Sequence, residues 1–253
     1  MGELRAAYRF DMVTKSRELF LSACDDIAET LSGWGFSYRR SGARPRLQLF
    51  AAEWQCELEL QTTRSQTSES TAVLVQVDLT SQRVADYRAE AGCGHPSGLV
   101  LGGFLEYWEP YPDGPFPHLN LGGEGRRKRL AEVEQRVRRG PLSVLDQLRD
   151  PGTFVGTAAD VTLVQSGGPA SWIDYLAAYD QKSQIPALLR RFEAGLHWND
   201  GSVRDQRRIL VDAQRIARGL HPITDYNPAA AHHLVEALDR ADRRRDLMCM
   251  ALS

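Results

Sequence analysis

The hydrophobic residues near the start of the chain recur every three or four positions. From Thr14 to Leu31 this spacing places them on one stripe of a helix. The stripe contains Leu19, Phe20, Ala23, Cys24, Ile27 and Leu31. Gly33 and Gly35 follow, and glycine commonly ends a helix, so the pattern predicts a helix that stops near Leu31.

The next segments change to a period of two. Phe36 to Arg40, Arg46 to Ala52 and Gln55 to Thr62 are short and alternate between apolar and polar residues. In the third segment one face carries Cys56, Leu58 and Leu60, and the other carries Glu57 and Glu59. These segments are predicted to be consecutive antiparallel strands.

A polar connection, Thr62 to Ser70, leads to the most strand-like segment of the chain, Thr71 to Thr80. Its apolar residues share one face: Val73, Val75, Val77 and Leu79. Leu99 to Tyr107 and His118 to Leu121 are predicted as two further strands. We therefore expect an α+β fold with the N-terminal helix packed on an antiparallel sheet of about five to six strands.

After Gly125 the sequence becomes mainly helical. Apolar spacing and end signals predict helices at Arg126 to Arg139, Pro141 to Leu148, Trp172 to Tyr179, Ile185 to Leu196, after Ser202, and after Asn227 and Pro228. Ser183 and Pro186 are predicted to be the cap and first-turn proline of one of them. Ala158 to Val164 is predicted as a strand. The chain thus divides into a sheet region, 1–123, and a mainly helical region, 124–253, which we expect to pack as one compact unit.

The composition is that of an ordinary globular protein, with 42% hydrophobic and 25% charged residues. No apolar run approaches the ~20 residues that cross a bilayer, and no secretory signal precedes the first helix. We therefore expect a cytoplasmic protein with no membrane partner.

The sequence lacks the motifs of common enzymes and metal sites. Cys24, Cys56, Cys93 and Cys249 form no CxxC pair, and there is no HExxH, GxSxG or Walker motif. Cys93 lies two residues from His95, but catalytic cysteine–histidine pairs are normally assembled across a fold rather than along the sequence. We expect no catalytic residue, no metal and no cofactor, and the absence of these motifs favours a protein that is not an enzyme.

The segment between the last two predicted strands is rich in aromatic residues and proline. Its four prolines limit backbone freedom, which lowers the entropy lost on binding. The candidate partner-binding residues are Tyr107, Trp108, Tyr111, Asp113, Phe116 and His118. The alternative is that the aromatic side chains fold back onto the core, as large apolar groups usually do.

A basic run follows. Seven basic and two acidic side chains give Gly125 to Arg139 a net charge of +5. Arg126, Arg127, Lys128 and Arg129 stand at the predicted helix start, where positive charge opposes the helix dipole. A bound phosphate or nucleic acid would relieve this conflict, which makes these four residues an alternative, anion-binding site. The overall net charge of −2 is low for a nucleic-acid binder, and a solvated charged face is the simpler interpretation.

The stretches LSGWGFSYRR, LQLFAAEWQCELELQT and GGFLEYWEP resemble a bacterial α+β domain family of unknown function, in which a Gly-Phe pair follows the first helix. The resemblance extends over about residues 15–195 and brings no catalytic residues with it. Domains of this kind are often immunity or interaction modules. The resemblance therefore implies a protein that binds another protein, such as an immunity-like inhibitor of a bacterial toxin.

Overall fold

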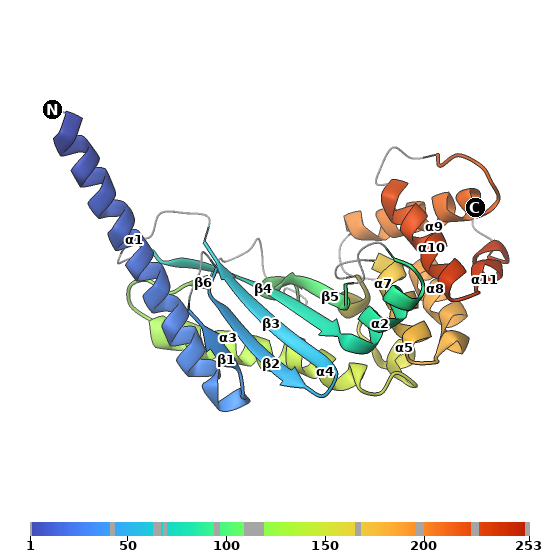
Figure 1. Cartoon of the computed structure of the whole chain (residues 1–253), viewed down its shortest axis with the longest axis horizontal. Helices are drawn as coiled ribbons and strands as arrows, with labels where there is room; N and C mark the ends of the chain where they lie inside the picture. Colours follow the sequence, from blue (N-terminus) through green and yellow to red (C-terminus); the bar gives the residue numbers. More distant parts are fainter. Residues whose placement is uncertain are drawn as a thin grey trace. The chain divides into compact units, whose positions relative to one another are not determined.

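The structure is a computed structural model that describes residues 2–40, 44–62, 67, 70–93, 97–108, 119–164, 168–195, 200–223 and 228–250. Contacts within the chain group it into two units (Figure 1). Unit 1 comprises Met1–Val77 and Phe104–Leu142, and unit 2 comprises Asp78–Gly103 and Ser143–Ser253. Each unit consists of two separate stretches of the chain, so this grouping differs from the predicted division into residues 1–123 and 124–253.

The predicted antiparallel sheet is confirmed. Its strands are β1 Ser37–Arg39, β2 Arg46–Ala51, β3 Trp54–Gln61, β4 Ala72–Ser81, β5 Leu99–Phe104 and β6 Leu119–Asn120. The strand order is β1-β2-β3-β4-β5, and β6 pairs with β4. The register places Leu47 opposite Leu58 and Gln48 opposite Glu57, so the apolar residues of β2 and β3 share one face.

The helix predicted from Thr14 is present as the end of a longer one, α1 Gly2–Leu31. Its predicted stripe is buried at Phe20, Ala23, Cys24, Ile27 and Leu31. A 3₁₀ turn, η1 Ser32–Trp34, follows, and Gly35 ends it with a φ of 84°, a value that glycine adopts at little cost. The core of unit 1 combines this stripe with the buried face of the sheet.

A second helix, α3 Arg126–Val137, completes this core. It contacts α1 and β6 and buries Val133 and Val137 (Figure 1). A short π-helical segment, η3 Arg138–Leu142, extends it and contains the glycine and proline that were predicted to end the helix.

Unit 2 is mainly helical. Its elements are α2 Gln82–Glu90, α4 Ser143–Leu148, α5 Phe154–Thr157, α6 Asp160–Val164, α7 Gly168–Ala178, η4 Lys182–Gln184, α8 Ile185–Ala194, α9 Asp200–Ala217, α10 Pro228–Arg240 and α11 Arg244–Met248. The most buried of these is α7, which contacts α2, α6, α8 and α10. Trp172 and Tyr175 of α7 pack against Phe154 of α5, with a tilted ring pair between Phe154 and Trp172 and edge-to-face pairs between Tyr175 and each of the other two rings. The aromatic cluster anchors α7 as the core helix of unit 2.

Two predictions about unit 2 are wrong. Ala158–Val164 is not a strand, because Asp160–Val164 forms helix α6. Thr162 and Leu163 are both buried, which the alternation of a half-exposed strand does not allow. Ser183 is not a cap, since it lies inside η4 and the residue before α8 is Gln184.

Helix α2 was not predicted at all. Ser81 caps it by accepting a hydrogen bond from the backbone N–H of Val84 at 3.3 Å. Val84 and Arg88 are buried one turn apart, but the second of these is charged and therefore adds nothing to a hydrophobic pattern. None of the helices in the described part of the chain is long and apolar enough to cross a bilayer.

Candidate functional sites

The structure describes only the beginning of the predicted aromatic loop. Trp108 ends a 3₁₀ turn, η2 Leu105–Trp108, and its side chain is 6% exposed and packs close to Gly140. The remaining candidates lie outside the described residues, or their side chains do: Tyr107, Tyr111, Asp113, Phe116 and His118. Trp108 therefore belongs to the core of unit 1, and the binding role of the loop stays a prediction.

Two of the four basic side chains at the start of α3 bind nearby groups of the protein itself. Arg126 forms an ion pair with Asp26 of α1, with 2.5 Å between Nε and Oδ2. Arg129 donates from Nη2 to the carbonyl oxygens of Gly122 and Glu124 at 2.5 and 2.8 Å. These contacts relieve part of the conflict with the helix dipole without a bound anion.

The other two cations, Arg127 and Lys128, are exposed and have no partner among the described residues. The shallow depressions beside them are lined by acids as well as by cations, including Asp26, Glu29 and Glu134. This helix start is therefore a mixed-charge surface.

A polar lattice covers one face of β2 and β3, which we call the outer face. Glu57 accepts from Gln48 at 2.6 Å and pairs with Arg46 at 3.0 Å. Glu59 pairs with Arg46 at 3.0 Å and with Arg44 at 2.8 Å. These cross-strand contacts fix the side chains of the outer face relative to one another.

The outer face also carries one large apolar side chain. Phe50 of β2 is 66% exposed and lies opposite Gln55 of β3. Two residues, Ala52 and Glu53, connect these strands, and Ala52 has a φ of 55°. Residues other than glycine rarely adopt this backbone conformation, and such strain is often kept at functional positions.

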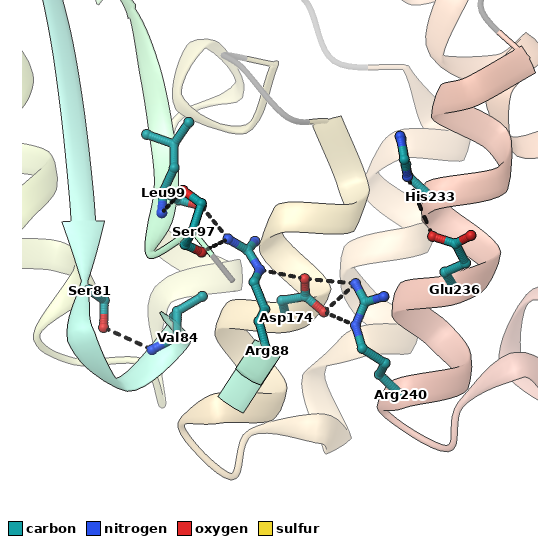
Figure 2. A network of polar contacts seen from close by, with 9 residues as sticks. All are labelled: Ser81, Val84, Arg88, Ser97, Leu99, Asp174, His233, Glu236 and Arg240. Atoms are coloured by element: carbon teal, nitrogen blue, oxygen red, sulfur yellow. Dashed lines mark hydrogen bonds and ion pairs between the residues drawn. The ribbon is translucent and has the colours of Figure 1, made fainter. Parts of the chain in front are cut away.

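Three helices of unit 2 bring a buried carboxylate between two arginines (Figure 2). Asp174 of α7 accepts from Arg88 of α2, with 2.8 Å between Nε and Oδ2. Arg240 of α10 donates to the same carboxylate from Nη2 at 2.9 Å to each oxygen and from Nε at 3.1 Å to Oδ1. The Nη1 of Arg88 also donates to the carbonyl oxygens of Ser97 and Leu99, at 2.5 and 2.9 Å.

The cluster is deeply placed. The side chains of Asp174, Arg88 and Arg240 are 3%, 11% and 18% exposed. Charges removed from water must be paired, and the fork of a guanidinium matches a carboxylate well. The hydrogen bonds to Asp174 raise the pKa of Arg240 against the opposing effect of burial, so this guanidinium stays charged.

The cluster forms the floor of an open cleft of about 780 Å³ within unit 2. The lining includes Cys93, Ser97, Ser171, His233 and Glu236. Tyr87 lies next to the cluster, where burial and the charge of Asp174 raise its pKa to about 12. The cleft is larger than either of the two depressions beside the start of α3.

Sequence reasoning missed all three members of the cluster. One signal was available: Asp174 is the only charged residue in the segment GPASWIDYLAA, which is otherwise mainly apolar. A lone acid in such a helix indicates a buried, paired carboxylate. Neither arginine could be identified as its partner, because arginines are frequent along the whole chain.

No group of His, Cys, Asp and Glu side chains within the described residues is arranged to hold a metal ion. Comparison of the chain with models of known protein families, with curated protein sequences and with solved structures finds no significant match. The resemblance to a bacterial α+β family stays a prediction.

Proposed function

We propose that this protein is a non-enzymatic module that binds another protein, and that the outer face of unit 1 takes part in the contact. The observation that carries the proposal is the exposure of Phe50, 66%, on a face that is otherwise polar. Large aromatic side chains are frequent anchors of protein interfaces, because one of them buries much apolar area in a complex.

The surroundings of Phe50 suit this role. The side chains of Arg46, Gln48 and Glu57 are already ordered by hydrogen bonds and ion pairs, so binding would cost little side-chain entropy. They also supply polar contacts around an apolar centre, which is the usual composition of an interface.

The partner implied by the sequence resemblance is a bacterial toxin that the protein would inhibit in the cytoplasm. We keep the loop from Tyr107 to Phe116 as a second proposed contact region, since its prolines favour a preorganised backbone.

The first experiment is capture of the partner from the native host by wild type, followed by affinity measurement with the isolated partner. Phe50→Ser is expected to raise Kd about tenfold or more, the usual effect of losing an interface anchor. Ile223→Ser is the matched control, because it removes an apolar side chain of similar exposure, 65%, from unit 2. Equal affinity of wild type and Phe50→Ser would rule out the outer face, and the same result for Tyr111→Ala would rule out the loop.

A second candidate function is binding of a phosphate-bearing ligand or nucleic acid by the basic segment 126–139. The observation in its favour is that Arg127 and Lys128 are exposed and have no described partner. If they contact phosphates, the double variant Arg127→Gln/Lys128→Gln should bind RNA or DNA more weakly, and its affinity should depend less steeply on salt. Absence of wild-type binding at about 50 mM salt, where nonspecific affinity is strong, would exclude this function.

A further inference from the structure

We propose that the cleft of unit 2 is a binding site for a small ligand with one oxyanion group, a phosphate or a carboxylate, held by Arg88 and Arg240. This site is separate from the protein-binding surface proposed in unit 1 and adds a second binding activity. The ligand would lie in the cleft beside the cluster drawn in Figure 2 and add a second anion to the one supplied by Asp174.

The cluster of Arg88, Asp174 and Arg240 is not electrically neutral. Two guanidinium groups share a single carboxylate, so the cluster carries a charge of +1 in a place where its side chains are at most 18% exposed. Excess charge that is largely removed from water is unfavourable unless it is compensated. An oxyanion in the cleft would compensate it.

Each of the two arginines keeps a donor nitrogen that a ligand can use. Arg88 uses Nε and Nη1 in the contacts described above, and Arg240 uses Nε and Nη2. Nη2 of Arg88 and Nη1 of Arg240 have no partner among the described residues. Each of these nitrogens belongs to a planar group that Asp174 already orients, so binding an oxyanion would immobilise little further.

The other residues that line the cleft limit how many anionic groups the ligand can carry. The hydroxyl groups of Ser97 and Ser171 border the cleft and can donate to an oxyanion or to a polar group beside it. Glu236 also borders it, and its side chain is 61% exposed. This carboxylate would repel a second anionic group, so a polyanion such as nucleic acid suits the cleft less well than a ligand with one anionic end.

The acid Asp239 lies on the same border, but Arg244 donates to both of its oxygens, with Nε 2.5 Å from Oδ1. Its negative charge is therefore largely offset by a local partner. The lining thus combines two largely buried arginines with an exposed carboxylate, Glu236, and this mixture of charge fits a ligand whose remainder is neutral or cationic.

The test uses inorganic phosphate and acetate as minimal probes of the two ligand chemistries. At low ionic strength, at least one of them is expected to raise the Tm of the full chain with saturation, and the stronger probe identifies the preferred oxyanion. Arg240→Gln should raise the Kd of that probe by about tenfold or more, the effect of one lost charge-assisted hydrogen bond. Arg88 is left intact in this variant because it also holds the carbonyl oxygens of Ser97 and Leu99.

Arg245→Gln is the matched control. Arg245 is exposed near the end of the chain and does not line the cleft, so its replacement removes the same charge without touching the site. The Kd of the probe for Arg245→Gln should equal its Kd for wild type. Equal weakening by both variants would show that the probe responds only to overall charge, and this would overturn the proposal.

Cys93 provides a readout that does not depend on the folding of Arg240→Gln. It lines the cleft and is partly exposed, whereas Cys24 and Cys56 are buried and Cys249 is removed as Cys249→Ser. A probe bound in the cleft should slow alkylation of Cys93 severalfold. Failure of both probes to raise the Tm and to slow this alkylation would overturn the proposal.

Discussion

Gly140 lies so close to Trp108 that a Cβ atom added to the glycine would be 2.9 Å from the Cβ of the tryptophan. Both residues are buried in unit 1, and Trp108 is fixed at the end of η2. The contact explains why a glycine interrupts the helical sequence at this position, since no other residue leaves room for the indole.

Gly140→Ala is accordingly expected to lower the free energy of unfolding by about 1–3 kcal/mol, the usual cost of overpacking a core. Urea unfolding, followed by tryptophan fluorescence and circular dichroism, measures the change. Gly33→Ala is the control, because an added Cβ there meets nothing within 4 Å. A loss of stability in the control as large as that in Gly140→Ala would show that helix propensity, not the contact with Trp108, is responsible.

Asp174→Asn should be among the most destabilising single substitutions in unit 2. It removes the negative charge that both Arg88 and Arg240 require, and breaking a buried ion pair in this way costs about 3–5 kcal/mol. Asp146→Asn removes a carboxylate that is 72% exposed and pairs with Arg149, so its effect should stay below about 0.5 kcal/mol. Thermal unfolding of the two variants compares them directly, and similar Tm values would contradict the role assigned to Asp174.

Ala52→Gly is expected to stabilise the protein slightly. Ala52 has a φ of 55° and is the first of two residues that join β2 to β3, whereas Glu53 has a negative φ. A turn of this kind favours glycine at its first position, so the substitution should add about 0.5–1 kcal/mol to the free energy of unfolding. Ala51→Gly lies in the strand itself and should have the opposite sign. A loss of stability in both variants would show that Ala52 is not strained.

Stability should fall in alkali, in part because of Cys24. Burial, with a further contribution from the charge of Asp25, raises the pKa of this thiol from 9.0 to about 12. Above pH 9 the unfolded chain releases the proton and the folded chain does not, so stability that is fully present below pH 9 is lost as the pH rises towards 12. The slope due to this group is at most about 1.4 kcal/mol per pH unit.

Urea unfolding at several pH values above 9 tests this assignment, and Cys24→Ala should show a shallower decline than wild type. Cys249→Ala is the control because Cys249 is exposed, and its decline should match that of wild type. If Cys24→Ala and wild type lose stability in parallel, other buried groups cause the effect. Tyr38 and Tyr175 are the first to examine, since burial also raises the pKa of each.

The sequence by itself determined the helices and strands in which apolar residues recur at a regular spacing. The stripe that ends at Leu31 and the alternation around Leu58 are repeated patterns of burial. They placed the end of α1 and both ends of β3 within a few residues, although α1 begins twelve residues before the predicted start at Thr14. The short segment Asp160–Val164 lacks such repetition. Four or five mainly apolar residues fit a strand and a helix equally well, and contacts with the rest of unit 2 decide between them.

Only the tertiary structure showed which residues form the cleft of unit 2. Asp174 is separated by 86 positions from Arg88 and by 66 positions from Arg240, and no local pattern connects them. A buried carboxylate is recognisable from the apolar residues around it, but its partners are chosen by the packing of α2 and α10 against α7. The sequence therefore determined that Asp174 needed a positive charge, and the fold determined which two arginines supply it, because an ion pair depends on distance in space rather than along the chain.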